Sequence, residues 1–308
     1  MTRVATYAQD QQLLADLMRI QGRVFTSQQQ ISTGKKAQSF QELGTDASGL
    51  LAAKSVEGRA NHYVKVSQEV LRRLELQDLQ LDALATAGAE LRQSVLDAIA
   101  TDKAIGLPEA LDAVFKKAVS VLNASYDGSK LFGGTRTDTD PVTVTSVAAL
   151  VAAPSISGIF ANDAVKPEAE IDEALSVEYG FLASDIGAGL MGAIQRIAAI
   201  DAGPLGPLSG DLTQAQRQAL EGELAGLAAM AEDLNATVAA NGNRHAVVED
   251  KLAAHKDAQA LLKGFISDIE DVDLAEAVTR LQADQTAMQA AAQVFGALQR
   301  SSLLDFLR

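Results

Sequence analysis

Apolar residues recur at alternating intervals of four and three near the start of the chain. The series is hydrophobic except for Ser27, and glutamines crowd the other faces. This spacing is typical of a heptad seam, in which one stripe of a helix packs against another helix. Thr33-Gly34 should end the helix, because glycine readily takes the left-handed conformation just past a helix end. The seam comprises Leu13, Leu17, Ile20, Val24 and Ile31.

A matching series closes the chain and predicts a last helix. Gln285 and Ala292 occupy two of its steps, and the others are hydrophobic. Each terminal helix therefore exposes a stripe that needs a partner, because isolated helices of this size are marginal in water. Either the ends become ordered only in an assembly, or they dock on the rest of the same chain. The C-terminal seam comprises Leu274, Val278, Leu281, Met288 and Phe295.

The same spacing of four and three predicts long helices between the two ends, with Leu81, Leu84 and Leu91 in the seam of one and Leu220 and Leu227 in the seam of another. A second helix, capped by Asp46 or Ser48, should end near residues 101–110, and a third should run from Pro108 to Tyr126. The longest is expected from Asp211 to about Ile266, on the order of 80 Å at 1.5 Å per residue.

The residue pattern changes from helix-like to strand-like between residues 137 and 181. Runs such as "VTVTSV", "ISGIF" and "LSVEYGF" resemble strands, and three prolines interrupt them. We expect a small β-rich module here, followed by a short helix at 185–202 that falls at its edge.

The predicted elements come in nearly the same order from either end of the chain, so its two halves can pair antiparallel to each other. The predicted fold is mainly α, a long antiparallel helical rod with terminal coiled-coil helices and a small β-rich insert. The break at 31–55 should meet 267–277, its returning counterpart. Three domains are expected: a terminal assembly domain of residues 1–42 with 267–308, a rod domain of 43–136 with 205–266, and an outer insert of 137–204.

Composition narrows the function. The formal net charge is −14, which argues against general affinity for nucleic acid or anionic membranes. No cysteine is present, so disulfides and thiol chemistry are excluded. The best apolar run, residues 147–160, is short and broken by Pro154 and Gly158, and the N-terminus lacks the unbroken apolar core of a signal peptide.

The glycine turn and the last helix also resemble a known family. Ser32, Thr33, Gly34 and Lys35 are similar to the N-terminal signature of bacterial flagellins and their hook-associated relatives. The segment "ISDIEDVDLAEAVTRLQADQ" (266–285) resembles the C-terminus of the same superfamily. Within it, "YDGSKLFGGTRTDTDPV" (126–142) and the terminal "SLLDFL" are most like the hook–filament junction family, the third hook-associated protein. Arg308 is more typical of flagellin, and a flagellin with a small outer domain is the alternative.

This resemblance implies a structural subunit of the bacterial flagellum and not an enzyme. Such subunits are secreted by the flagellar export apparatus and assemble outside the cell through their terminal helices. The implied partners are copies of itself, the first hook-associated protein, flagellin and a cytoplasmic flagellar export chaperone. Neither nucleic acid nor membrane is among them.

Few residues suggest chemistry, and we expect no catalytic, cofactor or metal site. The run Gly187–Gly192 fits Gly-x-Gly-x-x-Gly, so a dinucleotide-binding enzyme is a remote alternative. A glycine-rich helix start capped by Ser184 or Asp185 is the simpler interpretation. His245 and His255 are ten residues apart, too far to share a metal, and are read as polar contacts between helices.

The acidic run at Glu270, Asp271 and Asp273 could hold a cation. An acidic helix start near Asp268 explains it more simply.

Overall fold

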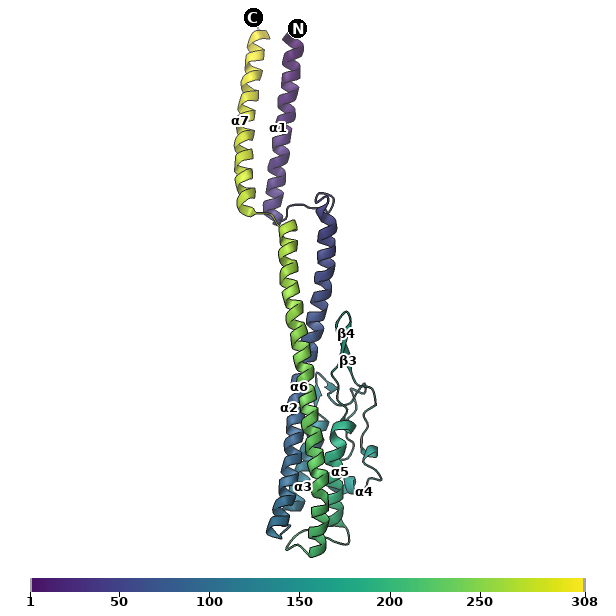
Figure 1. Ribbon diagram of the computed structural model, residues 1–308. Coiled ribbons are helices and arrows are strands. Elements are labelled where there is room, and N and C mark those ends of the chain that lie inside the picture. The colour runs from purple at the N-terminus through teal and green to yellow at the C-terminus, as the bar shows by residue number, and fades with distance from the viewer. Residues whose placement is uncertain (1, 307–308) are drawn as a thin grey trace. The chain divides into compact units, whose positions relative to one another are not determined.

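The computed structural model describes residues 2–306, with side chains for residues 11–297. Its helices and its two small antiparallel sheets confirm the expected fold class, mainly α with a small β component. Figure 1 shows the elements along the chain. They are α1 (Thr2–Thr33), α2 (Asp46–Thr101), α3 (Leu107–Leu122), β1 (Ser125–Tyr126), β2 (Ser129–Lys130), α4 (Val147–Ala152), a 3-10 turn (Ser157–Ile159), β3 (Glu168–Asp172), β4 (Leu175–Glu178), α5 (Ala183–Ala202), α6 (Gln214–Glu270) and α7 (Leu274–Phe306).

Most helix ends follow the local signals. α1 ends at Thr33, and Gly34 has φ 71°, the left-handed conformation expected of it. α2 begins at Asp46. The third helix is shorter than predicted and ends at Leu122, because the Asn123 side chain binds both the N–H and the carbonyl of Val142 at 2.8 and 3.1 Å. The chain then turns into the β1–β2 hairpin.

The chain divides into two compact units, residues 1–59 with 257–308 and residues 60–256. The larger unit holds the main core. In it, α2 and α6 share one buried cluster with α3 and α5. Leu81, Leu84 and Leu91 of α2 and Leu220 and Leu227 of α6 are fully buried, so the seams read from the sequence do form core here.

The insert contains fewer strands than its sequence indicates. "VTVTSV" forms only an isolated bridge, between Val142 and Phe160, before α4 begins. Ser146 accepts a hydrogen bond from Ala149 N and caps α4, while "ISGIF" contains a 3-10 turn. These two strand predictions are wrong because capping and packing on α5 outweigh β-propensity, which is weak in short segments.

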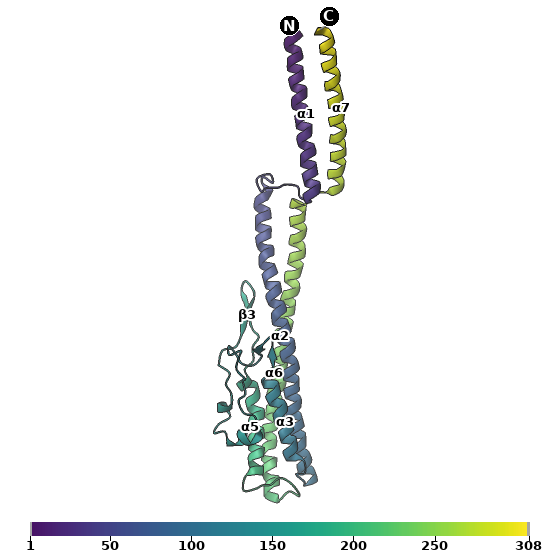
Figure 2. The same cartoon turned by 180° about the vertical axis from the view of Figure 1, so that it is seen from behind.

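The β3–β4 hairpin lies along the α2–α6 pair (Figure 2). His255 of α6 stacks on Tyr63 of α2 at 5.2 Å between ring centroids, and its Nε2 lies 2.9 Å from Ile171 O of the hairpin. His245 lies 3.8 Å from Glu75 of α2. Both histidines thus make contacts between helices, and His255 also holds the hairpin.

None of the described helices combines the length and apolar character needed to cross a membrane.

Candidate assembly surface

Helices α1 and α7 lie side by side and antiparallel in the smaller unit, as Figures 1 and 2 show. Arg23 of α1 binds Asp284 of α7, with Nη2 and Nε 2.9 and 3.0 Å from the same carboxylate oxygen. The two terminal helices therefore pair with each other within one subunit. The question becomes which of their apolar side chains this pairing leaves exposed.

The residues of the predicted seams fall into three groups. Val24 is buried. Leu274 and Val278 are exposed. The remaining seven are half-buried, namely Leu13, Leu17, Ile20, Ile31, Leu281, Met288 and Phe295. That these ten seam residues form contacts between subunits stays a prediction.

On α7 the covered stripe is displaced from the predicted seam at its start. Ala277 is fully buried, whereas the neighbouring Val278 is 40% exposed. From Ala277 the stripe continues through Leu281, Asp284 and Met288, which keeps the spacing of four and three. Sequence reasoning missed Ala277 because it favoured the larger side chain. The alternative register was visible in the spacing.

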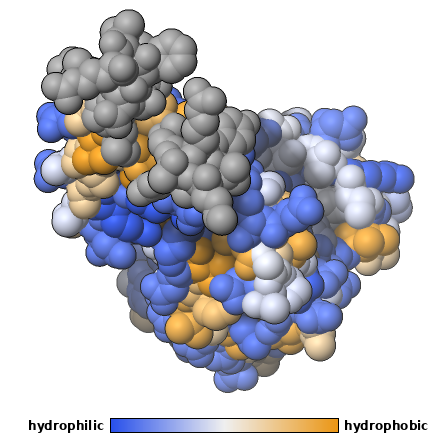
Figure 3. Space-filling view, turned by 90° about the horizontal axis from the view of Figure 1, so that it is seen from above, coloured by the Kyte–Doolittle hydropathy of each residue, from blue (hydrophilic) through white to orange (hydrophobic). Residues whose placement is uncertain are grey.

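A second row of apolar side chains on α1 was also missed. Leu14, Met18 and Phe25 are 44, 61 and 66% exposed, and their intervals of four and seven place them on one face of the helix. Leu261 and Phe265 are exposed one turn apart on the part of α6 in the same unit. In the space-filling view, apolar areas in orange interrupt the hydrophilic surface (Figure 3).

Exposed apolar side chains are concentrated in the smaller unit. Of sixteen exposed large hydrophobic residues among the described side chains, eleven belong to residues 1–59 and 257–308. This unit has 11 basic and 13 acidic residues, a net charge of −2, whereas residues 60–256 have 15 and 27, a net charge of −12. A nearly neutral unit with many exposed apolar side chains is suited to packing against other protein.

The break after α1 is tied to the turn before α7. Lys36 N donates to Glu270 O at 2.7 Å, and Val272 N donates to Gly34 O at 2.9 Å. Lys35 Nζ lies 2.7 Å from Asp271 Oδ1, and Lys54 Nζ lies 2.8 Å from Glu270 Oε2. The expected meeting of 31–55 with 267–277 is therefore confirmed.

These ion pairs shift the titration of both partners. The hydrogen bond from Lys35, joined by one from Ser267, lowers the pKa of Asp271 below its ordinary range. The hydrogen bond to Asp271 raises the pKa of Lys35. Both groups are partly exposed, so the pair contributes modestly to stability at neutral pH.

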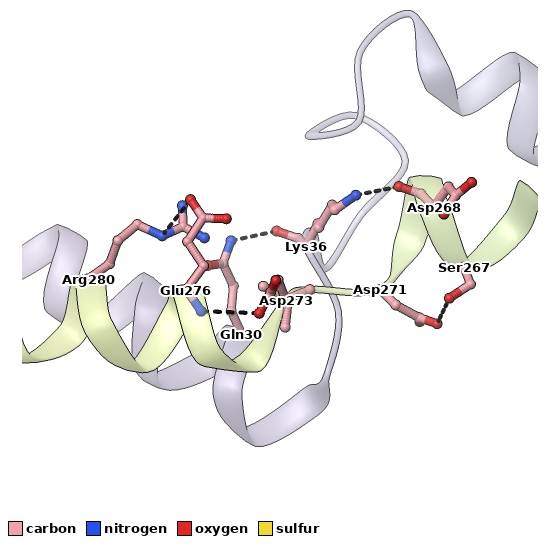
Figure 4. A pocket seen from close by; sticks show the side chains of 9 residues that line it. Gln30, Lys36, Ser267, Asp268, Asp271, Asp273, Glu276 and Arg280 are labelled. Atoms are coloured by element: carbon pink, nitrogen blue, oxygen red, sulfur yellow. Dashed lines mark hydrogen bonds and ion pairs between the residues drawn. The ribbon is translucent and has the colours of Figure 1, made fainter. Parts of the chain in front are cut away.

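A pocket of about 650 Å³ lies beside this tie (Figure 4). Gln30 donates to Lys36 O, and Lys36 Nζ reaches Asp268 O. Asp273 caps α7 by accepting from the N–H groups of residues 275 and 276 at 2.9 and 3.1 Å. The predicted acidic helix start is thus at Asp273 and not near Asp268, which lies inside α6.

The acidic run that could have held a cation is largely occupied by the chain itself. Glu270 and Asp271 pair with lysines, and Asp273 serves as the helix cap. Within the described residues, no group of three or more histidine and carboxylate side chains is arranged to hold a metal ion.

The glycine run Gly187–Gly192 lies inside α5 and serves packing. A Cβ on Gly187 would stand 2.6 Å from Leu122 Cδ1, so glycine allows α5 to approach α3. The preceding strand β4 is antiparallel to β3, and the described chain contains no parallel βαβ unit around the motif. The predicted cap is also wrong, because the residue before α5 is Leu182 and it makes no side-chain capping bond.

Comparison with known proteins connects this arrangement to the flagellum. Residues 228–307 match the family described as the bacterial flagellin C-terminal helical region. A search of curated proteins finds no match. A protein of Vibrio parahaemolyticus described as a flagellar hook-associated protein has a similar structure, with TM-score 0.59 and 17% identity over 73% of this chain and 97% of that one. The FlgL structure of Bacillus cereus gives TM-score 0.43 and 11% identity over 73% and 98%.

The first structural match bears on the fold, and the family match bears on the C-terminal third of the chain. The family match confirms the expected resemblance to flagellins, and the structural match shows a fold shared with a protein described as hook-associated. The family match covers α7 and most of α6, so it includes one helix of the α1–α7 pair and one helix of the α2–α6 pair.

Proposed function

We propose that this chain, which carries a flagellin C-terminal helical region on a flagellin-like fold, is a structural subunit that joins the flagellar hook to the filament. In this proposal it is exported and then assembles outside the cell through α1 and α7. Its neighbours are copies of itself, the first hook-associated protein and flagellin. A cytoplasmic export chaperone covers the C-terminal helix before secretion.

The observation that carries the proposal is the pair of terminal helices with an uncovered apolar row. The α1–α7 pairing covers Val24 and Ala277 but leaves Met18, Phe25 and Leu274 mostly in solvent. Isolated apolar residues are normal on protein surfaces, but a row with helical spacing on one face is not. Further copies of the same helices would cover such a row in a coiled-coil assembly.

The difference in net charge between the two compact units supports the same function. We propose that residues 1–42 with 267–308 form the assembly domain, that 43–136 with 205–266 form a helical rod, and that 137–204 form an outer module. The unit of residues 60–256, with its net charge of −12, would then face solvent, where like charges keep neighbouring subunits soluble.

Flagellin itself is the second candidate, because the family match is to a flagellin region. The two proteins differ in how assembly stops. A junction protein adds a limited layer to a hook that carries the first hook-associated protein and then accepts flagellin. A flagellin continues to add copies of itself and grows a filament.

The test is to add the purified chain to isolated hooks that carry the first hook-associated protein and to follow growth by electron microscopy. A short layer that flagellin then extends supports the junction function, and a continuous filament of this chain supports flagellin. No addition at all refutes both. An enzyme would leave the hooks unchanged.

Variants connect this test to the terminal helices. Ile20→Asp and Leu281→Asp place a charge in the half-buried stripes of α1 and α7 and should abolish addition while residues 60–256 stay folded. Leu79→Asp is the matched control, because Leu79 is 63% exposed in the larger unit. If both seam variants add normally to hooks, the assignment of the seams is wrong.

A further inference from the structure

The β3–β4 hairpin forms a small apolar cluster separate from the main core. Ile171 and Val177 of the hairpin are buried against Val70 and Leu74 of α2 and Val248 of α6. No other buried residue belongs to this cluster among those described. The hairpin is therefore held to the α2–α6 pair by its own set of contacts.

Polar contacts fasten the hairpin at both ends. Near its turn, Lys251 Nζ lies 2.7 Å from Asp172 Oδ2, and His255 Nε2 lies 2.9 Å from Ile171 O. Near its base, Arg244 Nη2 lies 3.3 Å from Glu178 Oε1. Three side chains of α6, spread over three turns, thus hold the two strands.

The helix seam beside this hairpin is unusually polar. Ser67, Gln77 and Asn241 are buried there, whereas the next part of α2, from Leu81 to Val95, buries only apolar side chains in its seam. Asn241 Nδ2 donates to Leu74 O at 3.0 Å, which fixes the register of the two helices at this level.

Four buried side-chain polar atoms in the described residues have no hydrogen-bond partner within the chain, and all four belong to this segment. They are Ser67 Oγ, Gln77 Oε1, Asn241 Oδ1 and Arg244 Nη1. A buried polar group without a partner destabilises the closed state, because water would satisfy it if the helices parted. The seam alone therefore favours local opening between residues 67–77 and 241–244.

We infer that the hairpin is a strap that holds this polar segment of the α2–α6 pair closed. Its docked apolar face supplies the burial that the polar seam lacks and keeps water from the four atoms. Docking of the hairpin and closure of the segment are consequently one local equilibrium, distinct from unfolding of the main core. This device goes beyond the proposed function and does not depend on it.

Amide hydrogen exchange of the full chain tests the strap. Ile171→Asp places a charge in the docked face and should undock the hairpin. Exchange should accelerate at least tenfold in peptides covering 64–78 and 238–252, and it should change less than threefold in peptides covering 84–98. Val165→Asp is the control, because Val165 is already 57% exposed just before the hairpin, and it should change neither region.

A second variant separates the strap from a general loss of stability. Asn241→Leu replaces one of the four buried polar groups by an apolar side chain, so the seam should depend less on the hairpin. In the double variant with Ile171→Asp, exchange in 64–78 should be at least threefold slower than in Ile171→Asp alone. Lys251→Met, a milder change, should accelerate the same peptides by a smaller factor.

Two results would overturn the inference. Unchanged exchange in 64–78 after Ile171→Asp would mean that the helix pair closes without the hairpin. Equal acceleration of 84–98 would mean that the hairpin belongs to the cooperative core and is not a local strap.

Discussion

Two adjacent residues of α1, Val24 and Phe25, should have separable roles. Val24 is 8% exposed and lies within the covered side of the α1–α7 pair, whereas Phe25 is 66% exposed on the uncovered row. We therefore expect Val24→Ser to weaken the terminal helix pair within one subunit. Phe25→Ser should leave the single subunit unchanged and weaken contacts between subunits.

The magnitudes follow from burial. Burying a large apolar side chain fully contributes about 1.5–3 kcal/mol, so covering the two-thirds of Phe25 that is exposed would contribute about 1–2 kcal/mol per subunit contact. Since 1.4 kcal/mol corresponds to a tenfold change in an equilibrium constant, Phe25→Ser should weaken self-association about 5- to 30-fold. Val24→Ser should cost the pair of helices up to about 1.5–3 kcal/mol, because the side chain is nearly fully buried.

Sedimentation velocity over a concentration series measures self-association, and far-UV circular dichroism with limited proteolysis measures the order of α1 and α7. The expected outcome is weaker association with unchanged helicity for Phe25→Ser, and earlier proteolytic loss of the ends for Val24→Ser. If Phe25→Ser associates as strongly as the natural chain, the uncovered row of α1 is not a contact between subunits. If it loses helicity at low concentration, the side chain packs within its own subunit.

Two further predictions concern the packing of α5 and the tie before α7. Gly187→Ala should lower the free energy of unfolding by up to about 2 kcal/mol, because the new Cβ would meet Leu122 Cδ1 at 2.6 Å and the cost of displacing this fully buried side chain outweighs the gain of about 1 kcal/mol from replacing a helical glycine. Gly222→Ala, with open space around it, should raise stability by up to about 1 kcal/mol in thermal denaturation. Equal effects would contradict the close approach of α3 and α5. The pKa of Asp271 is lowered in the folded chain. The ion pair with Lys35 therefore stabilises the folded chain at pH values above 3.8, the ordinary pKa of Asp271, and this stabilisation is lost as the pH falls below 3.8. The raised pKa of Lys35 keeps the pair charged up to high pH. Amide exchange at residues 34–36, corrected for the intrinsic pH dependence, should accelerate below pH 3.8. Asp271→Asn should show the faster exchange already at pH 7. If exchange responds to neither change, the backbone hydrogen bonds alone hold the tie.

The periodicity of the sequence was sufficient to predict the long helices and most of their ends. Spacing of four and three predicted α1, α2, α6 and α7, because the same apolar stripe that satisfies a helix period must be buried somewhere. Gly34 was readable as a helix end, since its left-handed conformation is a property of glycine itself. The proposed assembly surface was placed on the terminal helices for the same reason.

Which helix faces and which distant segments meet is set by tertiary packing. The choice of Ala277 over Val278 depends on how closely α7 approaches its partner, which spacing does not encode. Lys35 and Asp271 are 236 residues apart, and nothing local to either one selects the other. "VTVTSV" has the alternation of a strand, but a strand needs a neighbour to satisfy its hydrogen bonds, and the fold offers it a single bridge to Phe160. Local periodicity fixes an element because its cause lies within a few residues, whereas pairing is fixed by burial and hydrogen bonding that exist only once the chain has returned on itself.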